Sequence, residues 1–168
     1  VMPPGDFRNC LVALSDDESL VGELFQYRFN QGSGLEGHSF GNLFIVAMTN
    51  VTGSFERALY ESSRVLAVHG RILPATVANL SLAARMTDGT VVQGESSISE
   101  HGGSISQILI EPQDAAAHPE AVDAIEGAQL IVLGPGSLYT SILPNLLVPG
   151  IAGAIRSSSA PPVYVCNV

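Results

Sequence analysis

The chain has 168 residues, a formal net charge of −9 and seven positively charged side chains, all of them arginine. The lack of lysine excludes every mechanism that needs a lysine amine on this chain, such as a Schiff base or a Walker-type phosphate contact. Scattered arginines on an acidic chain without tryptophan provide neither a basic stripe nor a base-stacking platform, so we do not expect nucleic-acid binding.

The composition predicts a single globular domain over residues 1–168, because 46% of the residues are hydrophobic and only 14% are charged. Cys10 and Cys166 match neither a zinc-ligand spacing nor a disulfide framework, which favours a reducing compartment. Residues 127–155 carry no charge, but prolines and glycines interrupt them repeatedly, so we expect no membrane-spanning helix.

The first 70 residues are predicted to be largely helical, from their cap residues and the spacing of their apolar residues. We expect a first helix that is capped by Asp6 and runs to Leu14. A second begins at Asp16 and Asp17 and has Arg28 near its end, with Leu20, Val21, Leu24 and Phe25 on one face. An apolar helix follows from Ser39 to Met48, and a fourth, capped by Thr52 or Ser54, runs to His69 and Gly70. Residues 31–37 form a glycine-rich loop between the second and third helices.

The second half shows strand signals. Residues 79–86 alternate in polarity, Asp88-Gly89 indicates a hairpin, and residues 104–110 give another strand. A helix is expected to begin at Pro119. Strands at 129–133 and 162–166 enclose a glycine loop and helical material near 150–156, which is a βαβ pattern. We therefore predict an α/β fold: a three-layer α/β/α Rossmann-like sandwich with a mainly parallel sheet and a β-hairpin insert, in which ligands bind at the carboxyl ends of the strands.

The segment Gly134-Pro135-Gly136-Ser137 follows a buried strand and carries the strongest chemical signal. Glycines there let a ligand approach the backbone, and a helix that begins near Ser137 would direct free N–H groups at a phosphate. Thr140 and Ser141 add hydroxyl donors. The alternative is a plain strand-to-helix turn with Ser137 as the N-cap, and the spacing is not the GxGxxG fingerprint.

Two further polar segments open helices. In residues 37–43, His38 and Asn42 lie one helical turn apart and suit a ligand contact. The alternative is that Ser39 caps the helix and the His38 side chain bonds to a loop carbonyl.

In residues 3–10, the side chains Asp6, Arg8 and Asn9 cluster after a rigid turn, and the planar guanidinium of Arg8 suits a phosphate. The alternative is an exposed cap with an Arg8 ion pair. We expect Cys10 in the core. The histidines lack companions at metal-ligand spacing, so no direct metal ligand is predicted.

Together these segments resemble the gluconeogenesis-factor (YvcK-like) branch of the CofD-like family. The matching motifs are PPGDFRNCLVAL, GHSFGNLFIVAM, DGTVVQGES, GPGSLYTSILPNLLVPGI and PVYVCNV. The resemblance implies a Rossmann-like fold and a cytoplasmic bacterial protein needed for cell shape and for growth on gluconeogenic carbon sources. It also implies binding of nucleotide sugars such as UDP-N-acetylglucosamine, with no catalytic reaction or catalytic residue assigned.

Carried over by motif, the residues implied to line the ligand pocket are Asp6, Arg8, Asn9, His38, Asn42, Gly134, Pro135, Gly136, Ser137, Thr140 and Asn145. Without lysine, such a pocket has to hold an anion by backbone N–H groups, hydroxyls and Arg8, which suits a diphosphate that carries its own magnesium.

Two other functions stay open. A sister branch of the family is a transferase that moves a phospholactyl group from a guanylyl donor to a deazaflavin precursor with magnesium. A generic dinucleotide-binding module is the third reading. The sequence lacks the family's GGGTG-type loop and acidic segment, so we expect an incomplete domain with an exposed sheet edge. The low charge and apolar surface favour a homo-oligomer.

Overall fold

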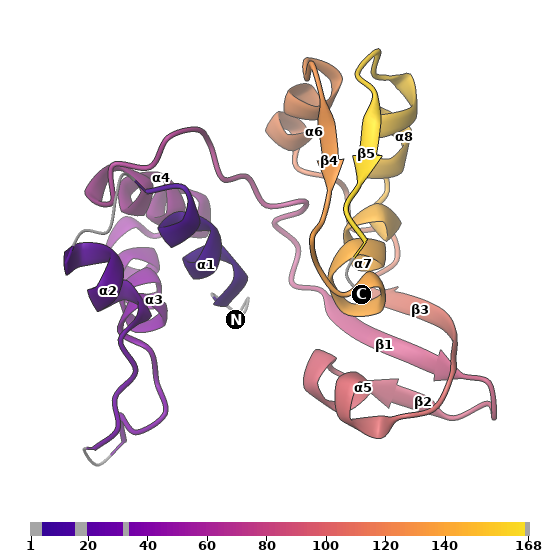
Figure 1. The fold of residues 1–168 in the computed structure, drawn as a ribbon, viewed down its shortest axis with the longest axis horizontal. Coiled ribbons are helices and arrows are strands. Elements are labelled where there is room, and N and C mark those ends of the chain that lie inside the picture. The colour runs from indigo at the N-terminus through magenta and orange to yellow at the C-terminus, as the bar shows by residue number, and fades with distance from the viewer. Residues whose placement is uncertain (1–4, 16–19, 32–33, 167–168) are drawn as a thin grey trace. The chain divides into compact units, whose positions relative to one another are not determined.

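The structure, a computed structural model, describes residues 5–15, 20–31 and 34–166. It contains two compact units, residues 1–73 and residues 74–168 (Figure 1). Whether these two units together form the single domain predicted over residues 1–168 is not tested by this division, so the single domain stays a prediction.

The first unit is helical, as predicted. Its helices are α1 (Gly5–Ala13), α2 (Leu20–Gln26), α3 (Phe40–Thr52) and α4 (Phe55–Val65). They enclose a core of Leu11, Phe25, Ile45, Leu59 and Leu66. The rings of Phe25 and Phe44 pack with their centroids 4.9 Å apart, which joins α2 to α3.

The starts of α3 and α4 follow the expected cap residues, whereas Asp6, the cap expected for the first helix, lies within α1. Ser39 caps α3, because its hydroxyl accepts a hydrogen bond of 3.2 Å from the Asn42 N–H. Gly53 ends α3 in the left-handed region with φ 73°. Of the two candidate caps for α4, Ser54 has this role, since its hydroxyl accepts from the Arg57 N–H, whereas Thr52 remains within α3.

One expectation about burial, that of Cys10, is wrong. Of the apolar residues predicted to share a face of α2, Phe25 is buried, whereas Leu20 is 80% exposed, and Val21 and Leu24 are exposed too. The helix is short, so one large ring takes the available core position. Cys10 is exposed, because its neighbour Leu11 occupies the core and successive helical residues point about 100° apart. Asp16 and Asp17 lie outside the described residues, and α1 begins at Gly5, so Asp6 lies within its first turn.

The second unit begins with an antiparallel sheet. Its strands β1 (Ser81–Met86), β2 (Val91–Gln93) and β3 (Ile105–Glu111) lie in the order β2-β1-β3. The predicted hairpin at Asp88-Gly89 is confirmed: Gly89 has φ 89°, and the Asp88 carboxylate accepts from the Thr90 N–H at 2.9 Å. Helix α5 (Glu95–His101), which the sequence analysis does not predict, covers this sheet through Ile98.

The remaining elements are the helix predicted at Pro119, followed by the predicted βαβ unit. They are α6 (Pro119–Glu126), β4 (Ile131–Leu133), a π-helical turn η1 (Leu138–Ile142), α7 (Leu143–Leu147), α8 (Ile151–Ser157) and β5 (Pro162–Tyr164). Strands β4 and β5 pair in parallel, with Ile131 opposite Pro162 and Leu133 opposite Tyr164. The α/β class is thus confirmed, with a two-stranded parallel sheet among the described residues.

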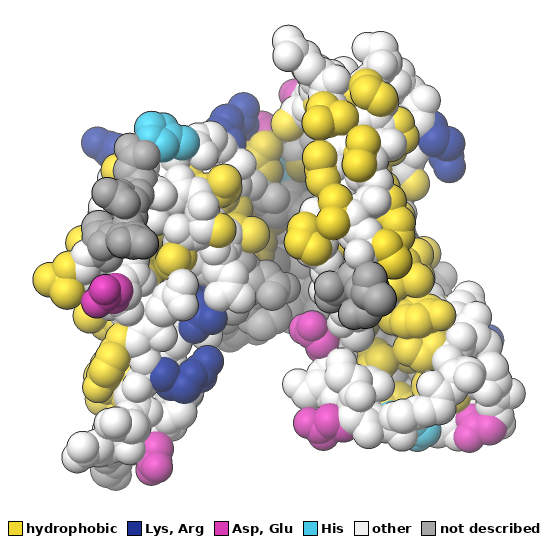
Figure 2. Space-filling view, viewed as in Figure 1, with side chains coloured by type: hydrophobic (Ala, Val, Ile, Leu, Met, Phe, Trp, Pro, Cys, Tyr) yellow, Lys and Arg dark blue, Asp and Glu magenta, His cyan; other side chains and the backbone are white. Residues whose placement is uncertain are grey.

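The two faces of β4 differ in burial. Paired residues of parallel strands share a face, so Val132 and Val163 lie on one face, and Ile131 and Pro162 lie on the other. Ile131 is buried, whereas Val132, Val163 and Val165 are exposed. All three residues of β5 are exposed, so that strand is open on both faces. Figure 2 shows apolar side chains gathered over these strands. Parallel sheets in folded proteins have both faces covered, so this open face is unusual for its type.

No single helix among the described residues is long and apolar enough to cross a membrane. The helices Leu138–Leu147 and Ile151–Ser157, bent by 78° relative to each other, have together the length and composition of such a span.

Candidate functional site

Two of the three polar segments singled out from the sequence meet in the first unit. The stem of Arg8, on α1, lies against the first turn of α3 at Gly41. A Cβ atom added at Gly41 would lie 2.8 Å from Arg8 Cγ, 2.9 Å from Arg8 Cδ and 2.6 Å from the Phe25 carbonyl oxygen. Glycine is therefore required here because of close packing, and Arg8 lies against the same first turn of α3 that contains Asn42, although the two are far apart in the sequence.

Two buried polar atoms mark this contact. Arg8 Nε, a donor, and Asn42 Oδ1, an acceptor, are both buried without a hydrogen-bond partner among the described residues. The Arg8 Nη2 group donates to Asn9 Oδ1 at 2.8 Å. Almost all buried polar atoms in proteins have a hydrogen-bond partner. A buried donor and a buried acceptor without partners near the start of one helix therefore indicate a place where a ligand or water forms hydrogen bonds.

His38 lies beside this cluster in the chain, but its ring is exposed. Its backbone makes the bonds: its N–H donates to the Leu35 carbonyl at 2.9 Å and its carbonyl accepts from the Phe29 N–H at 3.0 Å. Arg28 Nη1 donates to the Gly37 carbonyl at 2.5 Å and closes the same loop. The expected Ser39 cap is confirmed, whereas a side-chain bond from His38 to a loop carbonyl is absent from the described part of the chain.

The Asp6 side chain lies outside the described residues, so its place in the cluster stays a prediction.

The third segment lies in the second unit, at the carboxyl end of β4. Gly134 has φ 93°, and a Cβ atom there would lie 2.8 Å from the Val165 carbonyl oxygen. The Gly134–Pro135 peptide is cis. A Cβ atom at Gly136 would lie 3.2 Å from Ser141 Cβ. Both glycines are thus needed for the loop to turn tightly between β4 and the helix that follows.

Ser137 begins that helix as predicted. Its hydroxyl accepts from the Thr140 N–H at 3.4 Å, and its carbonyl accepts from the Ser141 and Ile142 N–H groups at 2.9 and 3.0 Å. The alternative of Ser137 as an N-cap is therefore confirmed, and it is compatible with ligand binding. The first N–H groups of a helix lack intrahelical acceptors and carry its positive dipole end, which favours an anion.

Thr140 and Asn145 lie further along the same helical stretch. Thr140 is half-buried in η1, and Asn145 is exposed on α7. Asn145 Nδ2 donates to the Ser141 carbonyl at 2.7 Å, so one of its donors already serves the helix. The predicted contact of Asn145 with a ligand stays a prediction, and the hydrogen bond to Ser141 gives this side chain a structural role as well.

Tyr164 is a neighbour of the glycine loop that the sequence analysis missed. It ends β5 opposite Leu133, directly before Val165, whose carbonyl approaches Gly134. Partial desolvation and a hydrogen bond with Cys166 raise the pKa of Tyr164 above its ordinary value of 10.0. The sequence signal that could have placed Tyr164 near the loop was the predicted pairing of the strands 129–133 and 162–166, because the carboxyl ends of parallel strands lie at the same edge of a sheet.

The donor set does not suit a resident metal ion. Among the described residues, no group of three or more His, Cys, Asp and Glu side chains could hold one. The magnesium implied by the family resemblance has no site built from the described residues, and the polar groups that the loop offers are backbone N–H groups, hydroxyls and amides.

Comparison with known proteins gives consistent matches over the whole chain. A model of the CofD family, described as 2-phospho-L-lactate transferase CofD, matches residues 1–168. The gluconeogenesis factor of Bacillus subtilis (strain 168) is 54% identical over 168 residues, which are 100% of this chain and 53% of that protein. The gluconeogenesis factor of Halalkalibacterium halodurans is 53% identical over 100% of this chain and 52% of its own length.

A solved structure agrees with the fold. A crystal structure of a Bacillus halodurans protein superposes with a TM-score of 0.94 at 54% sequence identity, covering 99% of this chain and 53% of that one. The chain spans about half the length of these relatives.

Proposed function

Because the chain belongs to the CofD family, we propose that it is the nucleotide-sugar-binding part of a gluconeogenesis factor. Relatives of that name are more than half identical to it over its full length. In this proposal the protein binds a UDP-sugar in the cytoplasm and regulates cell shape and growth on gluconeogenic carbon sources.

The observation that carries the proposal is the loop from Gly134 to Ser137. It places the start of a helix at the carboxyl end of a parallel strand, which is where open α/β folds bind nucleotides. Backbone N–H groups and the Ser137 and Thr140 hydroxyls are neutral donors, and no lysine is available. A diphosphate already partly neutralised by magnesium suits such a set better than a free multivalent anion.

The cluster of Arg8, Asn9, Gly41 and Asn42 supports the same proposal independently. It provides one cation with a planar donor fork, and an amide whose oxygen accepts no hydrogen bond within the described residues. These groups suit the hydroxyl and amide groups of a sugar nucleotide, which both donate and accept.

The test is calorimetric titration of the protein with UDP-N-acetylglucosamine, magnesium being present. Saturable heat is expected, with UMP binding more weakly because it lacks the diphosphate. NAD serves as the competitor that represents the dinucleotide alternative. No heat at millimolar UDP-sugar, or tighter binding of NAD than of the UDP-sugar, would overturn the proposal.

A transferase is the second candidate, because the matching family model carries the description of 2-phospho-L-lactate transferase. That activity needs a guanylyl-lactyl donor and a deazaflavin precursor. Formation of the phospholactyl product from this donor and this precursor in the presence of the protein would establish the transferase activity. If no product forms and the protein binds the UDP-sugar, the regulatory role is supported instead.

A further inference from the structure

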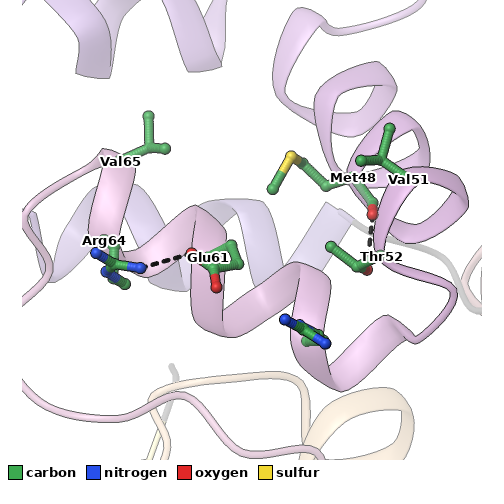
Figure 3. A pocket seen from close by; sticks show the side chains of 7 residues that line it. Met48, Val51, Thr52, Glu61, Arg64 and Val65 are labelled. Carbon is green, nitrogen blue, oxygen red and sulfur yellow. Dashed lines mark hydrogen bonds and ion pairs between the residues drawn. The ribbon is translucent and has the colours of Figure 1, made fainter.

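A second concave surface lies in the first unit, between the C-terminal half of α3 and the facing side of α4 (Figure 3). This α3–α4 groove has a volume of about 680 Å³, within the size range of small-molecule sites. Val51 lies roughly 14 Å along the axis of α3 from Asn42, at about 1.5 Å per residue. The groove is therefore separate from the cluster at Arg8 and Asn42.

The groove carries an excess positive charge on an acidic chain. Arg57, Glu61 and Arg64 follow one face of α4, because residues three and four apart are neighbours on a helix. Arg64 Nη1 and Glu61 Oε2 form an ion pair of 2.9 Å. The guanidinium of Arg57 makes no ion pair with any described residue. Two arginines and one glutamate leave one uncompensated cation here, whereas the whole chain has a net charge of −9.

The rest of the groove is apolar. Met48 and Val51 from α3 and Val65 from α4 line it, and Val51 and Val65 are 82% and 56% exposed. The Thr52 hydroxyl donates to the Met48 carbonyl at 2.7 Å, as Figure 3 shows, and also lies 2.9 Å from the Ser54 carbonyl. It is therefore not available as a donor, and the Arg57 guanidinium is the remaining polar anchor.

We propose that the α3–α4 groove binds a small organic carboxylate with an apolar body. The Arg57 fork matches a carboxylate in geometry and charge, and the apolar body covers Val51 and Val65. Because Glu61 already pairs with Arg64, one cation is left uncompensated, and a ligand with a single negative charge matches the groove better than a nucleotide with several. The ligand of this groove thus differs in class from the nucleotide sugar proposed for the other sites.

The test is methyl NMR of the protein, with Met48, Val51 and Val65 as reporters, during titration with sodium hexanoate. Acetate has the same charged group without the apolar chain, and hexylammonium has the same chain with the opposite charge. Saturable shifts of the three methyl signals are expected with hexanoate only. Equal shifts with hexylammonium, or shifts that never saturate, would overturn the proposal.

Two variants complete the experiment. Arg57→Gln is expected to weaken hexanoate binding by about 1.4-fold to fivefold, the range of an exposed ion pair. Arg156→Gln removes an exposed arginine of α8, outside the groove, and leaves the affinity unchanged. Equal affinity for the Arg57 variant and the parent protein would overturn the proposal. Concentration-dependent shifts of the same signals without hexanoate would assign the groove to a second copy of the chain and would overturn it too.

Discussion

The side chain of Arg8 lies across Gly41, so that the start of α3 accommodates the stem of an arginine from α1. A Cβ atom at Gly41 would approach Arg8 Cγ to 2.8 Å and the Phe25 carbonyl oxygen to 2.6 Å. This contact joins two segments that the sequence marks as functional, and it explains why glycine stands in the first turn of a helix, where it is otherwise unfavourable.

Gly41→Ala is expected to destabilise the protein by about 1–3 kcal/mol, because the methyl group has to displace a backbone carbonyl and not only a flexible side chain. Chemical denaturation measures the free energy of unfolding. The matched control is Gly153→Ala in α8, where a Cβ atom meets nothing within 4 Å. There we expect a gain of up to about 1 kcal/mol. Equal effects of the two substitutions would show that close packing at Gly41 is not decisive.

Gly136→Val is expected to abolish binding of UDP-N-acetylglucosamine while far-UV circular dichroism stays essentially the same. The added side chain would press against Ser141, whose Cβ lies 3.2 Å from the Cβ position, and so displace the turn whose N–H groups are proposed to hold the diphosphate. Calorimetry and circular dichroism of the same sample give both readouts. Gly136→Ala serves as the smaller step, with an intermediate affinity expected. An unchanged affinity of the valine variant would count against the loop as the diphosphate site.

The two faces of β4 should respond differently to truncation. Ile131→Ala is expected to lower the free energy of unfolding by about 2–4 kcal/mol, because this side chain is buried. Val132→Ala, on the exposed face, should change it by less than about 0.5 kcal/mol. Urea denaturation of both variants makes the comparison. A large loss at Val132 would mean that its face is covered in solution.

The hairpin at Asp88 predicts a pH dependence of stability. The hydrogen bond from the Thr90 N–H lowers the pKa of Asp88 below its ordinary value of 3.8 in the folded protein. A lowered folded-state pKa contributes stability above the unfolded-state pKa, and this contribution is lost as the pH falls through the folded-state pKa. Asp88→Asn keeps an acceptor oxygen but does not titrate. The stability of the parent protein relative to Asp88→Asn should therefore fall below pH 3.8, as measured by urea denaturation at several pH values.

Local signals predicted much of the fold. The Ser39 and Ser54 caps, Pro119 at the start of α6 and the Asp88-Gly89 hairpin are all confirmed, since each depends on a residue and its near neighbours in the chain. Helix α5 was missed because its sequence, ESSISEH, has one apolar residue and therefore no helical periodicity.

The sites were predicted in part. The glycine loop at 134–137 could be placed at a strand end from sequence, because a buried-type strand leads directly into it. The contact between Arg8 and Gly41 could not, since it depends on how α1, α2 and α3 pack. Tyr164 and the α3–α4 groove were missed for the same reason: each combines residues from two elements whose relative position no local pattern contains.

By itself, the sequence determined the class of side-chain chemistry available within this chain. A chain without lysine has to hold an anion with backbone N–H groups, hydroxyls, amides, histidine or arginine, whatever its fold. Tertiary structure decided which arginine is available for which task. Arg8 packs on Gly41, Arg64 pairs with Glu61, and Arg57 is left unpaired beside apolar side chains within the described residues. The physical reason is that a charge is a property of one residue, whereas its pairing and burial depend on neighbours that only packing brings together.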